Sequence, residues 1–280
     1  MKKFLSVLMA ATMLVGVMAL TGCGGDTTEP TTDEANNQSE PASTTATDLK
    51  TVTEGVLTMS TNAAFPPYES TDDSGNVVGI DADIAAAIAE KLGLKLQIDD
   101  MDFDGALAAP QSGKSDIVMA GVTVNEDRLL TLDFTESYAT GVQVVIVPEG
   151  SDVTLDNLGE QQIGTQRGTT GYIYCTDDYG EDHVVAYDDA IAAVKALNNG
   201  QIDCVVIDSA PAQELVKANP GLTILDTEYV TEDYAIGVAK GNTALLDAVN
   251  GALKELVEDG TVQSIIDKYI PADAGSAEAE

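Results

Sequence analysis

Hydrophobic residues recur along the chain with two alternating spacings, which predicts strands and helices in succession. Ile80, Ile84 and Ile88 fall on one face of a predicted helix over 81–92, and Gly93 can end it. Apolar and polar residues alternate over 94–98, as in a strand. By the same criteria we expect strands at 56–59, 94–98, 116–120, 141–147, 162–165, 184–185, 203–207, 222–225 and 234–239. Helices are expected at 81–92, after residue 165 through 172, and at 189–198, 211–218, 244–257 and 262–269.

This succession predicts an α/β fold in which a mostly parallel sheet is covered by helices on both faces. The pattern begins near residue 55 and starts again near residue 162, so we expect two α/β lobes. In open α/β sheets, ligands bind at the carboxyl ends of the strands. The turns that follow Met59, Ala120, Thr165 and Ile207 are therefore candidate binding turns.

The N-terminal segment predicts export. Lys2 and Lys3 precede an apolar run over 4–20, which is short for a membrane span and typical of a signal peptide. The run ends in Leu20-Thr-Gly-Cys23, which resembles the bacterial lipobox. We therefore expect a signal peptide at 1–22 and a lipid anchor on Cys23, on the outer face of the cytoplasmic membrane. An uncleaved anchor helix with an incidental cysteine is the alternative.

Two further segments are too polar to bury a core. Residues 23–54 are rich in Thr, Glu, Asp, Ser and Pro and contain no aromatic residue, which predicts a flexible linker behind the anchor. Residues 271–280 are expected to form a flexible tail.

Composition excludes several classes of partner. The chain of 280 residues has a formal net charge of −34, which repels nucleic acid and anionic lipid headgroups. His183 is the only histidine, which excludes a metal site with several histidine ligands. We expect no metal, no cofactor and no nucleic-acid partner. Cys175 and Cys204 could form a disulfide after export or remain two buried thiols, because spacing does not give their Cα separation.

Polar residues that suit a zwitterion follow the candidate turns. Asn125 is expected to cap a helix with Arg128 three residues into it, and Arg128 can grip a carboxylate through two hydrogen bonds. Thr169 and Thr170 open a helix whose first N–H groups form an anion seat. Asp208 ends a strand and could bind an ammonium group. Each residue has an ordinary alternative role, namely a surface salt bridge, a capped turn and a helix cap.

The turn after Met59 carries aromatic residues. Pro66 and Pro67 fix an extended turn, so Phe65 and Tyr68 can wall a pocket. The alternative is that both rings are core residues that anchor the loop.

In order and spacing, these motifs resemble the polar amino-acid-binding proteins of ATP-driven importers, which belong to family 3 of the extracellular solute-binding proteins. The resemblance covers about residues 54–270. It rests on the segments Ala64-Phe-Pro-Pro-Tyr-Glu69, Gly79-Ile-Asp-Ala-Asp83, Met101-Asp-Phe-Asp-Gly105, Ala120-Gly-Val-Thr-Val-Asn-Glu-Asp-Arg128, Gly168-Thr-Thr170 and Val206-Ile-Asp208.

The resemblance implies a type II periplasmic-binding-protein fold, with two lobes joined by two crossover strands that act as a hinge. Lobe 1 would comprise 55–143 plus 233–270, and lobe 2 would comprise 144–232. The segment 79–83 resembles a fold signature rather than a site.

The resemblance also assigns roles to residues. Arg128, Thr123 and the Thr170 amide would hold the ligand carboxylate, and Asp208 and the Gly121 carbonyl would hold the ammonium group. Phe65 and Phe103 would pack on the ligand side chain, with Asn62 deeper. The full expected ligand-binding set is Asn62, Phe65, Phe103, Ala120, Gly121, Thr123, Arg128, Gln166, Thr169, Thr170 and Asp208.

Four positions depart from the family pattern, and one of them is Ile207, which offers no polar side chain before Asp208. Asn62 stands where members that bind basic ligands often carry Asp, and Gln166 stands where some glutamine binders carry Lys. These changes favour a ligand with an uncharged side chain. Pro110 stands where the family continues a helix, so that helix should be short or kinked.

The expected function is therefore that of a monomeric lipoprotein that captures a free amino acid between its lobes and delivers it to the permease of an ABC transporter. A lipoprotein that presents the closed form to a receptor would use the same cleft. A dehydratase-type enzyme on this fold would need a carboxylate or His poised over the substrate, and His183 lies away from the four binding turns. We therefore expect no enzyme activity.

Overall fold

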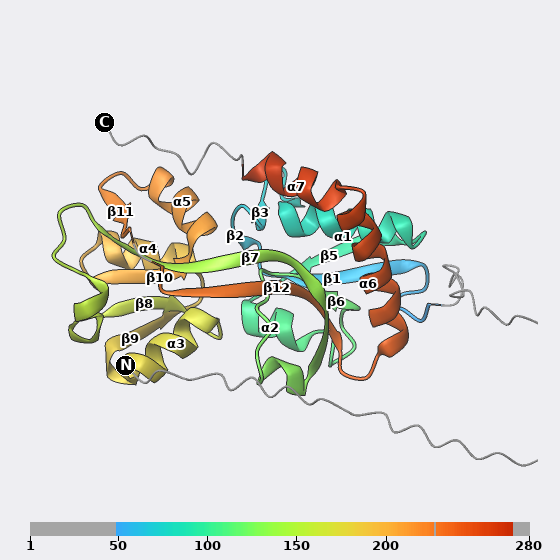
Figure 1. The fold of residues 1–280 in the computed structure, drawn as a ribbon, viewed down its shortest axis with the longest axis horizontal. Coiled ribbons are helices and arrows are strands. Elements are labelled where there is room, and N and C mark those ends of the chain that lie inside the picture. The colour runs from blue at the N-terminus through green and yellow to red at the C-terminus, as the bar shows by residue number, and fades with distance from the viewer. Residues whose placement is uncertain (1–48, 227, 271–280) are drawn as a thin grey trace, which may run out of the picture. The chain divides into compact units, whose positions relative to one another are not determined.

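The computed structural model describes residues 49–226 and 228–270, which form an α/β fold with long strands at its centre (Figure 1). The signal peptide, Cys23, most of the expected linker and the expected tail lie outside the described residues. Within the described part of the chain, no helix has the length and apolarity needed to cross a bilayer.

Most of the elements follow the predicted alternation, but the short strands β2, β3 and β4 were not predicted. The strands are β1 (Val56–Thr61), β2 (Ala64–Phe65), β3 (Glu69–Thr71), β4 (Val77–Val78), β5 (Lys95–Asp100), β6 (Ile117–Val118), β7 (Leu132–Pro148), β8 (Ile163–Gln166), β9 (Val184–Tyr187), β10 (Cys204–Asp208), β11 (Leu222–Ile224) and β12 (Val230–Ala239). The α-helices are α1 (Ile80–Lys91), α2 (Phe103–Ala108), α3 (Thr170–Tyr179), α4 (Ala190–Asn198), α5 (Ser209–Ala218), α6 (Thr243–Glu258) and α7 (Thr261–Tyr269). Short 3₁₀ helices are η1 (Arg128–Leu130), η2 (Leu155–Glu160) and η3 (Glu181–His183).

The main sheet contains two parallel blocks joined by two antiparallel strands. Its order is β5-β1-β6-β12-β7-β10-β8-β9, with β11 paired to β7. β1 is parallel to β5 and β6, and β8 is parallel to β9 and β10, whereas β12 is antiparallel to both β6 and β7. β7 and β12 run side by side between the blocks (Figure 1). The expected α/β fold with two crossover strands is confirmed.

The core shows why each block forms a layer between helices. On β7, Val144 and Ile146 pack with Val194 of α4 in one apolar cluster, while Val145 and Val147 pack in another. Successive side chains of a strand point to opposite faces, so both faces of this block are buried. The other block is covered by a cluster that includes Ile84 and Val249 on one face and by Phe103 and Ala106 on the other.

Both crossover strands are longer than expected. The apolar run predicted a strand at 141–147, but β7 begins at Leu132, and β12 begins at Val230 rather than at residue 234. In the first half of β7 only every third residue is buried, so this half contains no apolar run by which the sequence could indicate a strand. Its pairing with β12 extends from Val230 opposite Gln143 to Ala239 opposite Leu132. Tertiary pairing therefore decided these boundaries.

Local chemistry accounts for the short helix α2 and its position. Asp102 Oδ1 accepts a hydrogen bond from Gly105 N at 2.9 Å, which caps the N-terminus. The helix ends at Ala108, two residues before Pro110, as expected from the missing N–H of proline. Because Phe103 is its first residue, the cap also fixes where that ring lies.

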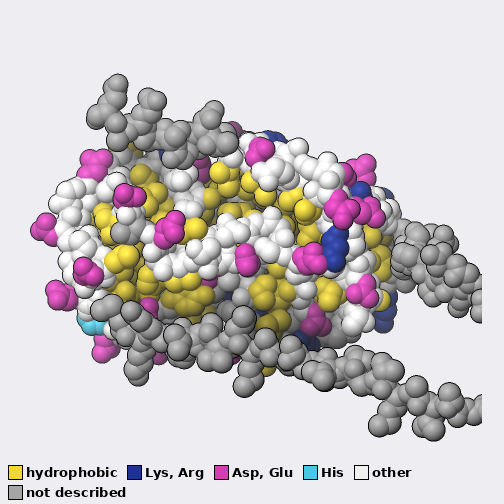
Figure 2. All heavy atoms as spheres, in the orientation of Figure 1, with side chains coloured by type: hydrophobic (Ala, Val, Ile, Leu, Met, Phe, Trp, Pro, Cys, Tyr) yellow, Lys and Arg dark blue, Asp and Glu magenta, His cyan; other side chains and the backbone are white. Residues whose placement is uncertain are grey.

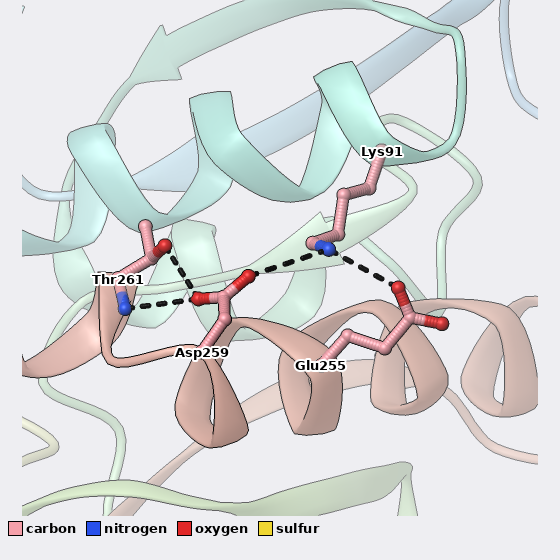
Figure 3. A network of polar contacts seen from close by, with 4 residues as sticks. All are labelled: Lys91, Glu255, Asp259 and Thr261. Atoms are coloured by element: carbon pink, nitrogen blue, oxygen red, sulfur yellow. Dashed lines mark hydrogen bonds and ion pairs between the residues drawn. The ribbon is translucent and has the colours of Figure 1, made fainter.

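The outer helices are joined by an exposed network at the C-terminal end of α1 (Figure 3). Lys91 Nζ lies 3.1 Å from Glu255 Oε2 and 3.6 Å from Asp259 Oδ2. Asp259 Oδ1 accepts hydrogen bonds from the backbone and hydroxyl of Thr261 at 3.0 and 2.6 Å, at the start of α7. Exposed ion pairs contribute about 0–1 kcal/mol each, so this network orders α6 and α7 rather than dominating stability.

The alternative of two buried thiols is the one that the structure shows. Cys175 and Cys204 are both unbonded and lie in the apolar cluster with Val145 and Leu158, so the alternative disulfide is not formed. Burial raises the pKa of each thiol to about 12. Because the thiolate is the reactive form, both sulfurs act as apolar packing groups.

Acidic side chains are spread over the surface. In Figure 2, Asp and Glu side chains are scattered over the visible face rather than gathered in one patch. The net charge of −34 therefore acts as a general negative field around the molecule.

Candidate functional site

The expected turns meet at one cavity with an empty volume of about 540 Å³. All of the expected ligand-binding residues line it, from Asn62, Phe65 and Phe103 to Thr169, Thr170 and Asp208. The lining also includes Glu69, Gln143, Ala190, Val205, Val206 and Ile207, which were not expected. The strand ends at β1, β6, β8 and β10 therefore converge, as predicted for an α/β sheet.

Arg128 is a buried cation at the first turn. Its side chain is 8% exposed, and its guanidinium carbon lies 5.3 Å from the centroid of the Phe103 ring. Nη1 donates to Thr123 O at 2.7 Å, and Nη2 donates to Gly168 O at 3.3 Å. Among the described ion pairs, none includes Arg128. A buried cation without an ion pair is costly, so an anionic ligand group would relieve that cost.

The local structure around Arg128 differs from the expectation. Asn125 Oδ1 accepts a hydrogen bond from Arg128 N at 2.8 Å, but Asn125 is not the expected N-cap residue, because Asp127 directly precedes the 3₁₀ helix η1. Arg128 is the first residue of η1 rather than the third residue of an α-helix. The segment turns back at Thr131, which starts the approach to β7. The prediction of an α-helix was wrong because it rested only on the capping residue, whereas the chain enters β7 at Leu132, with only Thr131 between the short η1 and the strand.

The opposite turn forms the N-terminus of α3. Thr169 Oγ1 accepts from Tyr172 N at 3.3 Å, and Thr169 O accepts from Ile173 N at 3.1 Å. Helix geometry leaves the N–H groups of Thr170 and Gly171 without partners inside the helix. Both residues stand at the positive end of the helix dipole, which suits an anion such as a carboxylate.

Asp208 is a buried carboxylate at the end of β10. It is 7% exposed, and Oδ2 accepts from Gln143 Nε2 at 2.9 Å, while Oδ1 has no partner among the described residues. Its side chain makes no hydrogen bond to the start of α5, so helix capping does not explain its position. Burial raises the pKa of Asp208 to about 7, and the charge of Glu232 adds to this effect. A cationic ligand group would stabilise its ionised form.

Gln143 and Glu232 were not predicted as site residues. Gln143 lies on β7 and Glu232 on β12, and they are 2% and 5% exposed. Gln143 Nε2 donates to Asp208 Oδ2 and to Glu232 Oε2, both at 2.9 Å. Their only sequence signal is a polar residue inside a long strand, and that signal does not indicate burial.

A second buried acid pair supports the Gly121 turn. Asp81 Oδ2 accepts from Gly121 N at 3.0 Å, and Asp81 Oδ1 accepts from Tyr138 Oη at 2.8 Å. Glu69 is fully buried, and desolvation together with the charge of Asp81 raises its pKa well above the usual range. The fold signature at 79–83 thus holds one of the binding turns in place.

The two aromatic residues of the proline turn have different roles. Phe65 lines the cavity, whereas Tyr68 is 4% exposed and packs edge-on against Tyr234 at 5.2 Å. Gly121 has a φ of +54°, and a Cβ on it would lie 2.8 Å from the Phe65 ring. The turn therefore needs glycine both for its backbone and for the approach of Phe65.

Direct hydrogen bonds join the two sides of the cavity. Gln166 Nε2 donates to Asn62 Oδ1 at 2.8 Å, and Arg128 reaches Gly168 O. Asn62 Nδ2 donates to Met101 O at 2.8 Å, so its amide is oriented from behind. The turns of the two lobes are in contact, as in a closed cleft.

Comparisons with known proteins agree with this geometry. The family model of bacterial extracellular solute-binding proteins, family 3, matches residues 57–272. A protein of Neisseria gonorrhoeae named "Probable histidine-binding protein" is 33% identical over 99% of this chain and 98% of its own length. ABC transporter arginine-binding protein 1 of Escherichia coli K12 is 31% identical over 77% of this chain and 90% of its own length.

Solved structures show the same fold. An ancestral arginine-binding protein bound to glutamine has a TM-score of 0.74 and 39% identity, covering 78% of this chain and 98% of its own. The arginine-, lysine-, histidine-binding protein ArtJ of Geobacillus stearothermophilus has a TM-score of 0.72 and 30% identity, covering 76% and 94%. These relatives are solute-binding transport proteins rather than enzymes. The chain has the type II periplasmic-binding-protein fold and belongs to family 3 of the bacterial extracellular solute-binding proteins.

Proposed function

We propose that this protein binds a free amino acid in the cavity between its lobes and delivers it to the permease of an ABC transporter. The observation that carries the proposal is the placement of opposite charges in one cavity. Arg128 and the start of α3 offer two seats for a carboxylate, and Asp208 offers an unpartnered oxygen to an ammonium group. The lobes would be 55–143 plus 233–270 and 144–232, and the monomer would suffice for binding.

The ligand side chain is proposed to be basic. The comparisons do not confirm the expected uncharged side chain, because several relatives are named for arginine or histidine, while others are named for cystine and glutamine. A hollow beside Phe103 is lined by Asp102, Asp104 and Asp188, with Arg167 as its only cation. This negative potential favours a cationic side chain, and the rings of Phe65 and Phe103 can hold a cation without an ion pair. Asn62 therefore does not exclude such a ligand.

The test is a thermal-shift panel of the free amino acids on the purified chain. L-arginine at about 100 times its Kd should stabilise the folded state by about 2.7 kcal/mol. Arg128→Ala and Asp208→Ala should each abolish this stabilisation, whereas Lys217→Ala, which removes an exposed cation that lines neither the cavity nor the hollow, should retain it. A parent protein that responds to no amino acid would refute the proposal.

The lipid anchor is a separate part of the proposal. It rests on the resemblance of Leu20-Thr-Gly-Cys23 to a lipobox. Serine cannot carry the lipid expected on Cys23, and stable anchoring needs two or more acyl chains. A Cys23→Ser variant expressed in a bacterial host should therefore move from the membrane fraction to the soluble exported fraction. An unchanged membrane fraction would favour the uncleaved helix instead.

A further inference from the structure

Four polar side chains form a continuous chain of hydrogen bonds at the wall of the cavity, and three of them line it. Asp208 Oδ2 accepts from Gln143 Nε2 at 2.9 Å, and the same nitrogen donates to Glu232 Oε2 at 2.9 Å. Thr170 Oγ1 donates to that carboxylate oxygen at 3.0 Å. All four side chains are at least nine-tenths buried. The chain therefore links the proposed ammonium site with the proposed carboxylate seat without passing through the ligand.

The two central members of this chain lie on the crossover strands. Gln143 is on β7 opposite Val230, and Glu232 is on β12 opposite Gly141. On its other side, Gln143 is opposite Asp208 of β10, where the pairing of β7 with β10 begins, so Gln143 stands where the crossover enters the second lobe. The hydrogen bonds thus run from the hinge strands to both binding turns of that lobe.

The side chain of Gln143 packs closely against the first turn of α3. A Cβ on Gly171 would lie 3.0 Å from Gln143 Oε1, so the amide of Gln143 reaches the first turn of α3. Glycine at 171 is the residue that permits this approach. The start of α3 is therefore hydrogen-bonded to Glu232 and packed closely against the amide of Gln143.

We propose that Glu232 and Gln143 form a polar tether on the two crossover strands, which positions Thr170 and Asp208 for the ligand and joins the binding turns of the second lobe to the hinge. Glu232 is a positioning residue, since it does not line the cavity. The inference rests on the proposed function, because that function assigns Thr170 and Asp208 to the two poles of an amino acid. A change in the geometry of the hinge strands would therefore move Thr170 and Asp208 relative to the ligand.

Titration of L-arginine by calorimetry tests the tether. Glu232→Ala removes the acceptor that holds Thr170, so the affinity should fall roughly tenfold or more, as expected for a hydrogen bond to a charged group. Glu232→Gln keeps an oxygen that accepts from both donors, so its affinity should stay within about threefold of the parent. Asp233→Asn is the matched control, because this exposed acid on the same strand makes its described side-chain bond only to Thr140, at 3.3 Å. It should bind like the parent.

A double substitution separates positioning from general damage. Thr170→Val removes the hydroxyl that donates to Glu232, so adding it to Glu232→Ala should cause little further loss. When Thr170→Val is added to Asp233→Asn, the affinity should fall by as much as it does when Thr170→Val is made in the parent protein. Additive losses for Glu232→Ala and Thr170→Val would overturn the tether, as would a Glu232→Gln protein as weak as Glu232→Ala.

Hydrogen exchange provides a readout that does not depend on the ligand. In the ligand-free protein, Glu232→Ala should speed exchange of the Tyr172 and Ile173 amides, which are bonded to Thr169 at the start of α3. Asp233→Asn should not. Unchanged exchange at these amides would overturn the tether even if L-arginine binds. A parent protein that binds no amino acid would instead refute the proposed function, while the exchange experiment would still decide the tether.

Discussion

Asp208 stands at a position where the demands of stability and of binding oppose each other. Its carboxylate is buried with one oxygen unpartnered, and burial raises its pKa to about 7. An acid whose pKa rises on folding holds its proton more tightly in the folded state, so its stabilising effect is lost as the pH rises from about 4 to 7. The ionised form that an ammonium ligand needs is therefore destabilising without the ligand.

Asp208→Asn should consequently stabilise the ligand-free protein while removing its binding. At pH 8 we expect unfolding free energy to rise by about 1 to 3 kcal/mol, and this difference should shrink as the pH falls toward 4. Thermal denaturation across this pH range measures it. Glu228→Gln, an exposed change of the same charge, should show no pH-dependent gain. Equal behaviour of the two variants would contradict the assignment.

Ligand affinity should depend on pH for the same reason. Between pH 6 and pH 7 the ionised fraction of Asp208 rises about fivefold, so the affinity for an amino acid should rise by about that factor. Calorimetric titrations at each pH measure this slope. Asp81 titrates in a similar range, because burial raises its pKa to about 6, and it accepts a hydrogen bond from Gly121 N at the site. Tyr138→Phe removes the hydrogen bond that Tyr138 donates to Asp81, so the slope measured in this variant separates the contribution of Asp81 from that of Asp208. An affinity that is flat over this range would show that Asp208 is ionised before the ligand arrives.

At the scale of elements, the caps of short helices place side chains at the site. Asp102 caps α2, and the first residue of α2 is Phe103, which lies beneath the Arg128 guanidinium. A helix of six residues has little intrinsic stability, so its position depends on the cap and on packing. Loss of the cap should therefore displace Phe103 and weaken ligand binding in the cavity.

Asp102→Ala should lower stability by about 1 kcal/mol and also weaken ligand binding several-fold. Asp259→Ala provides the matched control, because Asp259 accepts from Thr261 N at the start of α7, in the network of Figure 3. Because Asp259 precedes the N-cap residue Gly260, its loss should cost about 1 kcal/mol of stability, as for an ordinary hydrogen bond, without a change in affinity. Chemical denaturation and calorimetry of both proteins measure the two effects. An Asp102→Ala protein that binds the ligand as tightly as the parent would show that α2 keeps Phe103 in place without its cap.

At the scale of the whole molecule, the crossover strands set the approach of the lobes. Gly141 lies on β7 opposite Glu232, and a Cβ there would clash with Asp208 Oδ1 and the Tyr234 hydroxyl. The closed cleft therefore requires a residue without a side chain at this point. The tether and this glycine act at the same junction.

Gly141→Ala should weaken ligand binding at least about tenfold, because Asp208 must move from its place under the cavity. Small-angle scattering with saturating L-arginine should show a more expanded particle than the parent. Gly251→Ala in α6 is the control, since a Cβ there meets no atom within 4 Å. That change should raise stability by about 0.5–1 kcal/mol and leave affinity unchanged. A compact, tightly binding Gly141→Ala protein would contradict the role of the hinge glycine.

Much of this architecture could be read from the chain alone. Helices such as α1 and α4 were predicted within about one residue, because apolar spacing reflects which face is buried. The turns with Arg128, Thr170 and Asp208 could be placed at one site because strand ends converge in an α/β sheet. The short α2 was indicated by Pro110.

Tertiary structure alone decided the remaining features. Gln143 and Glu232 are far apart in sequence and meet only because β7 and β12 pair across the hinge. The same pairing set the length of both strands, and packing rather than spacing left Cys175 and Cys204 as separate thiols. Periodicity in a sequence reports the environment of one element, and burial of polar groups depends on partners that another element brings. The sequence by itself therefore determined which turns reach the cleft, whereas the fold determined what holds those turns together.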